Sequence, residues 1–138
     1  MNFKNRQFGE LDFEGKHVIT FSQGLIGFEE SRKFLIVDDE DSQPFRWLVS
    51  LEDPEMSFPL LDPELVVPDY NILQREEKKT TFVVATLRET VEESTVNLRS
   101  PIVIDNTTQN GKQVVLEDDS LSLQHPLLSQ PAHLLGNE

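Results

Sequence analysis

The sequence predicts an all-β protein, a small antiparallel β-barrel-like single domain with short or no helices. Three observations support this fold class. Apolar residues alternate with polar ones or form short continuous runs, Gly and Pro turn signals recur between these runs, and no segment keeps a long helical period. The length of 138 residues fits one domain over residues 1–138, with residues 1–15 and 126–138 expected to be peripheral or flexible.

The first half of the chain predicts several short strands. Residues 17–21 (HVITF) read as a strand, and residues 24–28 (GLIGF) place two glycines around two aliphatic residues, which indicates a tight corner packed on the core. Residues 34–37 (FLIV) form a continuous apolar run typical of a buried strand. Residues 45–51 alternate, and this alternation favours a core position for Trp47 over surface recognition. Pro59 lies within a second alternating run and indicates an edge strand or a bulge.

The second half predicts further strands of similar length. Residues 80–87 (TTFVVATL) are rich in β-branched side chains and form a strong strand candidate. Residues 70–73 and 120–124 are weaker candidates. Between them, residues 95–116 hold two β-rich runs joined by a polar connection that ends in Asn110-Gly111, a strong hairpin signal.

The alternation in this hairpin favours one register. A two-residue loop at Asn110-Gly111 would place Asp105 opposite Leu116. A three-residue loop over residues 109–111 pairs Thr108 with Lys112 and Ile104 with Leu116, so that the apolar side chains share one face. Gly111 then occupies the position where a type I turn with a bulge needs a positive φ, and we predict this loop.

Charge is the strongest compositional signal. Twenty-five acidic residues against 12 basic ones give a formal net charge of −13. Such a surface disfavours direct binding to nucleic acid or to anionic membranes, and it favours a basic protein partner. The alternative is that acidity only keeps the protein soluble. The absence of cysteine agrees with a cytoplasmic protein, and no secretory signal or membrane-spanning run is visible.

The residues offer little for catalysis. The chain has no cysteine, its three histidines (His17, His125 and His133) form no known metal or catalytic motif, and no spacing singles out a carboxylate pair. The acidic run of residues 38–41 lacks the ligand spacing of a calcium loop. We therefore predict no enzyme activity, no cofactor and no metal.

Acidic clusters instead lie at the predicted strand ends. If they gather on one face they form a docking surface, and if they are scattered they are ordinary solvated loops. Tyr70, in a turn-rich stretch, suits an interface or a structural role equally. The candidate partner-binding residues are Glu52, Asp53, Glu55, Asp62, Glu64, Asp69, Tyr70, Glu117, Asp118 and Asp119.

Three stretches together resemble the family of the flagellar assembly factor FliW. They are residues 19–29 (ITFSQGLIGFE), residues 51–70 with their Asp62-Pro63 and Pro68-Asp69-Tyr70, and residues 97–104 (NLRSPIVI), which residues 111–116 (GKQVVL) extend. The resemblance runs in order from about Val18 to about His125. It implies a non-enzymatic β-barrel-like adaptor that binds the translational repressor CsrA, relieves repression of flagellin messenger RNA, and also binds flagellin.

One departure from the family pattern is visible, because relatives usually carry a longer insertion where this chain has only residues 71–80. We therefore carry no partner contact of the relatives over to this segment. Two other functions stay open at this point: a small barrel enzyme with a carboxylate pair in its mouth, and a flagellin export chaperone that does not bind CsrA.

Overall fold

The computed structural model describes residues 1–70 and 78–128, and this part of the chain is built from strands and short turns of 3-10 helix. Each 3-10 turn is three residues long: η1 Gly15–His17, η2 Glu40–Ser42, η3 Pro63–Leu65 and η4 Val91–Glu93. The strands are β1 Asn2–Asn5, β2 Gly9–Asp12, β3 Ile19–Phe21, β4 Lys33–Asp38, β5 Arg46–Ser50, β6 Ser57–Leu61, β7 Lys79–Thr86, β8 Thr95–Asp105, β9 Asn110–Gln113 and β10 His125–Pro126.

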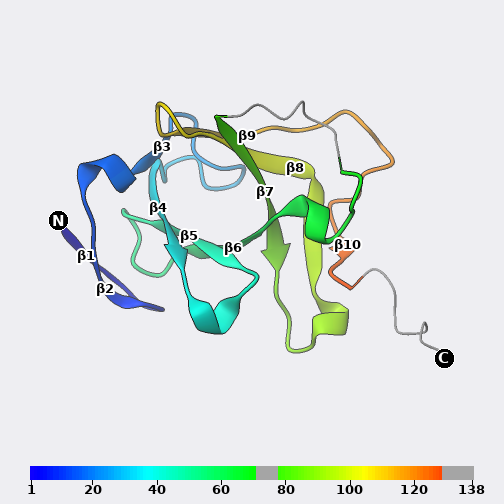
Figure 1. The fold of residues 1–138 in the computed structure, drawn as a ribbon, viewed down its shortest axis with the longest axis horizontal. Coiled ribbons are helices and arrows are strands. Elements are labelled where there is room, and N and C mark those ends of the chain that lie inside the picture. Colours follow the sequence, from blue (N-terminus) through cyan, green and yellow to red (C-terminus); the bar gives the residue numbers. More distant parts are fainter. Residues whose placement is uncertain (71–77, 129–138) are drawn as a thin grey trace.

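The seven strands from β3 to β9 close into a barrel (Figure 1). Neighbours from β3 to β9 pair antiparallel in chain order, and a parallel pairing of β3 with β9 closes the ring, with Thr20 opposite Asn110 and Phe21 opposite Gly111. Closure leaves few unpaired strand edges. The predicted fold class, an all-β barrel with only short helices, is confirmed.

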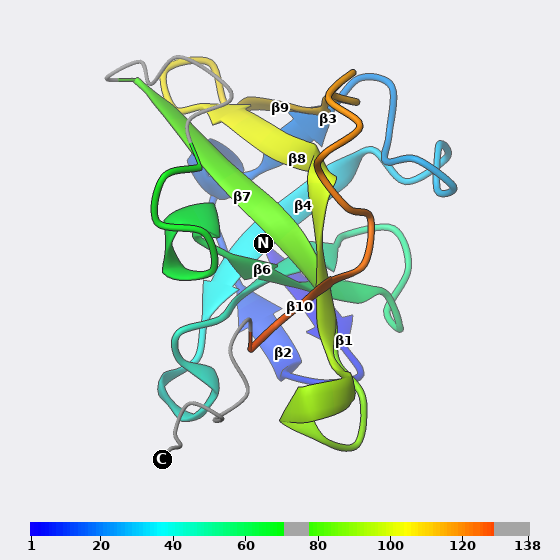
Figure 2. The same cartoon turned by 90° about the vertical axis from the view of Figure 1, so that its right-hand side faces the viewer.

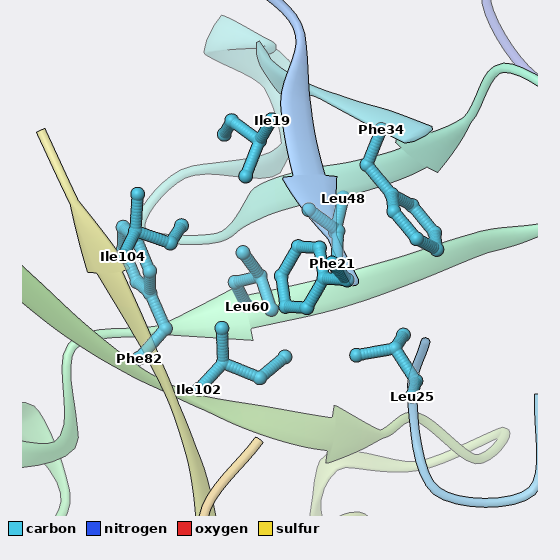
Figure 3. Packing of buried hydrophobic residues seen from close by; sticks show 9 residues of the cluster. All are labelled: Ile19, Phe21, Leu25, Phe34, Leu48, Leu60, Phe82, Ile102 and Ile104. Carbon is cyan, nitrogen blue, oxygen red and sulfur yellow. The ribbon is translucent and has the colours of Figure 1, made fainter. Parts of the chain in front are cut away.

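The barrel interior is filled with side chains. Every strand from β3 to β8 contributes to one buried cluster, and Figure 3 shows its members pointing toward one another. The members are Ile19, Phe21, Leu25, Phe34, Leu48, Leu60, Phe82, Ile102 and Ile104. Full burial of side chains of this size contributes about 1.5–3 kcal/mol each, so this cluster makes a large contribution to the stability of the fold.

A second cluster lies on the other face of β6 and β7. Leu61 and Val83 belong to it, whereas their chain neighbours Leu60 and Phe82 point into the barrel. The segment from η3 to Tyr70 covers this outer cluster, which continues onto Leu116. The two clusters together explain why the chain stabilises a barrel with only modest apolar content.

The N-terminal residues form a two-stranded hairpin, β1–β2, that is separate from the barrel sheet (Figure 1). It contacts the loop between β5 and β6, where the Arg6 N–H donates to the Pro54 carbonyl at 2.8 Å. The Phe8 ring packs edge-on against the Trp47 indole, with centroids 5.9 Å apart. The prediction that Trp47 belongs to the core is confirmed only in part, because Trp47 is half-buried under this hairpin and belongs to neither buried cluster, while Leu48 enters the barrel.

The hairpin of β8 and β9 exists, but its predicted register is wrong. Ile104 pairs with Gly111 and Asp105 with Asn110, so the connection is residues 106–109 and not 109–111. Lys112 consequently pairs with Val103 rather than Thr108, and Leu116 joins the outer cluster while Ile104 lies in the barrel.

Side-chain capping explains this longer loop. The Asp105 carboxylate accepts hydrogen bonds from the Thr107 and Thr108 N–H groups at 2.9 and 3.2 Å. These bonds hold the pKa of Asp105 below 3.8. The Gln109 N–H donates to the Asp105 carbonyl at 2.8 Å, and Gln109 itself takes the positive φ of 60°. The left-handed position is thus Gln109 and not Gly111.

Other expectations had mixed outcomes. The strand predicted over residues 80–87 is confirmed as β7, whereas His17 ends η1 instead of starting a strand. The strand predicted over residues 120–124 is wrong, and the two-residue β10 follows it. Pro59 lies in the half of β6 that β7 does not pair, because that pairing begins at Leu60. The candidate strand at residues 70–73 lies mostly outside the described residues.

Candidate functional site

The corner between β3 and β4, residues 24–31, is tightly constrained. Gly24 and Gly27 take positive φ values of 68° and 87°, a conformation that favours glycine. A Cβ atom on Gly24 would lie 2.6 Å from the Glu29 backbone, so the corner closes on itself. Leu25 is anchored in the barrel at 4% exposure. The predicted tight corner packed on the core is confirmed.

The same corner presents apolar side chains to solvent, which the sequence did not indicate. Ile26 is 52% exposed and Phe28 is 44% exposed. The Phe28 ring and the Phe58 ring of β6 pack edge-to-face with centroids 5.2 Å apart, so Phe28 is supported by the barrel while it stays partly exposed. A corner that anchors one apolar residue and exposes its neighbours has the chemistry of a recognition surface.

Gln113 of β9 fastens this corner to the barrel. Its side-chain oxygen accepts the Ile26 N–H at 2.9 Å, and its side-chain nitrogen donates to the Ser100 carbonyl at 3.1 Å. The exposed apolar residues are therefore presented by a rigid element, which lowers the entropic cost of binding.

A groove of about 350 Å³ runs beside Phe28, and we call it the corner groove. Three carboxylates line it together with two large apolar side chains. Glu29 accepts the Gly27 N–H at 3.1 Å and Asp53 accepts the Glu55 N–H at 3.0 Å, whereas Glu30 makes no hydrogen bond or ion pair with the described residues. The lining residues are Gly27, Phe28, Glu29, Glu30, Ser31, Asp53 and Met56.

The first predicted acidic cluster adjoins this groove. The Glu52 carboxylate accepts the N–H groups of Arg32 and Lys33 at 2.6 and 3.1 Å, so it holds the start of β4. Glu55 lies 3.5 Å from the Arg6 guanidinium of the N-terminal hairpin in an exposed ion pair. Asp53 is the member of this cluster that lines the groove.

The second predicted cluster surrounds η3. Asp62 caps this turn by accepting the Glu64 N–H at 3.0 Å, and Asp69 is exposed. Tyr70 is 6% exposed, and its hydroxyl donates to the Leu98 carbonyl at 2.7 Å. Burial raises the pKa of Tyr70 to about 12. Tyr70 therefore has a structural role, because its ring packs in the outer cluster and its hydroxyl bonds to the Leu98 carbonyl.

The third predicted cluster follows β9. Asp118 accepts the Ser120 hydroxyl at 2.6 Å and the Ser120 N–H at 2.9 Å, and these bonds lower its pKa. Asp119 pairs with the Arg99 guanidinium at 2.6 Å. Glu117 is exposed. Two of the three carboxylates in this cluster therefore already bond to other residues of the chain.

The three acidic clusters do not gather on one face. The loop between β5 and β6 and the chain after β9 lie at opposite sides of Figure 1, while η3 and the chain after β9 lie at opposite sides of Figure 2. Three aspartates of these clusters and two aspartates outside them share a different role. Asp39, Asp53, Asp62, Asp105 and Asp118 each accept the N–H of the residue two positions later, which is the bonding of an Asx turn.

The mouth of the barrel next to β3 and the loop between β8 and β9 holds a cavity of about 230 Å³. The Arg46 guanidinium lies 5.7 Å from the centre of the Phe82 ring and pairs with Asp38 at 2.5 Å. No carboxylate is among its described lining residues, which are His17, Ile19, Ile36, Arg46, Thr80, Phe82, Ile104, Asn106 and Gln109. This mouth does not present the carboxylate pair that the enzyme hypothesis requires.

No group of three or more His, Asp or Glu side chains in residues 1–70 and 78–128 is arranged to hold a metal ion. No helix in the same ranges is long and apolar enough to cross a bilayer.

Comparison with known proteins gives one consistent family. The family model described as FliW protein matches residues 2–127. The chain is 34% identical to the flagellar assembly factor FliW of Caldanaerobacter subterraneus subsp. tengcongensis, over 94% of this chain and 95% of the relative. It is 39% identical to the protein of that name from Thermosipho africanus, over 89% of this chain and 93% of the relative. A crystal structure of the flagellar assembly factor FliW superposes with a TM-score of 0.86 at 27% identity, covering 95% of this chain and 99% of that one.

Proposed function

We propose that this chain, which belongs to the FliW family of flagellar assembly factors, is a non-enzymatic cytoplasmic adaptor that binds the translational repressor CsrA. Binding would relieve the repression of flagellin messenger RNA. The same adaptor would bind newly made flagellin, so that free flagellin competes for it and couples synthesis to export.

The net charge of −13 is the observation that carries the proposal. A repressor that binds RNA presents basic surface, because RNA affinity depends on Lys and Arg contacts with phosphates. An acidic adaptor attracts such a surface over a Debye length of about 10 Å at 0.1 M salt, and like-charged partners are rejected. The same charge disfavours direct competition by this chain for RNA.

The filled barrel interior supports an adaptor over an enzyme. Nine buried apolar side chains occupy the interior, so binding is left to the outer surface and loops. Loops on a rigid barrel are the usual place for recognition.

The test is a titration of the full chain with CsrA and with flagellin from the same organism, each at about 50 mM and about 500 mM salt. We expect CsrA to bind at low salt and to lose roughly tenfold or more in affinity at high salt, because screening weakens contacts between opposite charges. A translation reporter carrying the flagellin leader should be repressed by CsrA and restored when this chain is added.

Three results would change the proposal. Binding of neither protein would refute it. Binding of flagellin without CsrA would select the export chaperone instead. CsrA binding without salt dependence would remove the electrostatic part and leave the adaptor role.

A further inference from the structure

We propose that the corner groove is the docking site for a basic segment that carries one large apolar side chain flanked by Lys or Arg. This inference rests on the proposed function, since the segment would belong to the basic repressor. It assigns this role to residues 24–31 and to Asp53 and Met56 of the loop between β5 and β6, so that of the predicted acidic clusters only the first contributes a residue to the groove.

The apolar part of the groove is exposed and rigidly held. Phe28 and Met56 line it, and the Phe28 ring is 44% exposed while its edge contacts Phe58. Two positive-φ glycines and the buried Leu25 fix the corner backbone. A partner side chain placed against Phe28 would lose freedom, but the corner itself would lose little.

The polar part of the groove is anionic. Its lining residues include Glu29, Glu30 and Asp53 and no cation. The nearby Arg32 guanidinium is directed to the Glu29 carbonyl, with the nitrogen Nε 3.5 Å from that oxygen. An apolar side chain with neighbouring Lys or Arg residues would therefore satisfy both the ring and the carboxylates.

Glu30 distinguishes this groove from the predicted acidic clusters. The carboxylates of Glu52, Asp62 and Asp118 already accept backbone N–H groups, and Asp119 pairs with Arg99. Glu30 has no such partner among the described residues, so a cation could pair with it without breaking a bond of the fold. An exposed ring beside an uncommitted carboxylate is the combination expected for a hot spot with a polar rim.

The experiment compares three variants of the full chain in titrations at low salt with CsrA and, in parallel, with flagellin. Phe28→Ala removes the apolar anchor, and Glu30→Lys reverses the uncommitted charge. Asp69→Lys is the matched control, because it changes the net charge equally from the segment after η3, which lies across the molecule from the corner in Figure 2.

We expect Phe28→Ala and Glu30→Lys each to weaken CsrA binding by about tenfold, and Asp69→Lys to stay within about twofold of the unmodified chain. Glu30→Lys removes no contact of the fold, so its effect on CsrA binding still tests the groove if Phe28→Ala loosens the corner. Circular dichroism checks that each variant is folded.

The outcomes separate the groove from the proposed function. If the unmodified chain does not bind CsrA, both are refuted. If it binds and the two lysine variants weaken binding equally, only overall charge matters and the groove is refuted. If Phe28→Ala and Glu30→Lys lose flagellin but keep CsrA, the occupant is flagellin and the basic-segment proposal is overturned while the adaptor role stands.

Discussion

Adding a methyl group at Gly111 should destabilise the barrel. Gly111 lies in β9 opposite Phe21, where β3 and β9 close the ring. A Cβ atom at this position would lie 2.5 Å from the Cζ atom of Phe21, well inside van der Waals contact. Phe21 is fully buried and packs edge-on against Phe34 with ring centroids 5.2 Å apart, so its ring has little room to retreat.

The expected size follows from two opposing terms. Overpacking a tight core costs about 1–3 kcal/mol. Replacing glycine by alanine at an ordinary φ returns about 0.4–1 kcal/mol by restricting the unfolded chain. The net loss for Gly111→Ala should be about 1–2 kcal/mol, which in a domain of this size corresponds to a Tm lower by roughly 3–10 °C.

The loss of unfolding free energy is measured by thermal and urea unfolding of two variants, Gly111→Ala and Gly15→Ala. A double-mutant cycle combines Gly111→Ala with Phe21→Leu. Gly15 is the control, since a Cβ atom there would meet only the Met1 side chain at 3.8 Å. Phe21→Leu removes the outer ring atoms, so it should relieve part of the Gly111→Ala penalty. A neutral Gly111→Ala, or penalties that simply add in the cycle, would refute the reasoning.

Three further predictions concern other parts of the molecule. Spectroscopic titration of Tyr70, the only tyrosine, should give a midpoint near 12. Because the pKa of Tyr70 is raised in the folded state, the stability that the buried neutral phenol contributes is complete below pH 10 and is lost as the pH rises toward 12. Tyr70→Phe should lower the free energy of unfolding in urea by about 1–2 kcal/mol, because it leaves the Leu98 carbonyl without its hydrogen bond from the Tyr70 hydroxyl. Phe8→Ala should expose Trp47, the only tryptophan, to solvent, shift its fluorescence to longer wavelength and increase its quenching by iodide. An unchanged spectrum would show that Phe8 does not shield Trp47. The pKa of Asp105 is lowered, so its capping of the hairpin loop is present above pH 3.8 and lost as the pH falls, which NMR amide shifts of the loop should follow in the native chain and not in Asp105→Ala.

The strands that the sequence predicted well are those whose pattern reflects burial directly. β4 and β7 are runs of apolar and β-branched residues, and the structure places both in the barrel wall. Barrel closure was implied by the number of short strands, but the parallel pairing of Thr20 with Asn110 was not predictable, because it joins residues distant in sequence without a local signal.

Faces and registers were predicted less well, for a physical reason. Alternation divides the residues of β5 into two sets but does not say which set enters the barrel, and the N-terminal hairpin covers Trp47 on the other face. In the hairpin of β8 and β9, Asn110-Gly111 suggested a turn. The Asp105 carboxylate instead caps an earlier loop, and Gly111 is needed for the close approach of Phe21.

The candidate site shows the same limit. Clusters of acidic residues were visible in the sequence, but their hydrogen bonds were not, and the structure uses Asp53, Asp62 and Asp118 to hold turns. The exposure of Phe28 was also hidden, because a glycine-flanked apolar segment reads as core until the backbone shows that Leu25 alone turns inward.

The turn-holding aspartates and the exposed Phe28 together indicate how an acidic barrel keeps its negative charge from destabilising its fold. Carboxylates that accept backbone N–H groups gain a local partner for their charge, so much of the acidity stabilises turns while it still contributes to the long-range field. Specific recognition then needs only a small place where an uncommitted carboxylate meets exposed apolar surface. Glu30 beside Phe28 is such a place, which is why a charge reversal there should act differently from an equal reversal at Asp69.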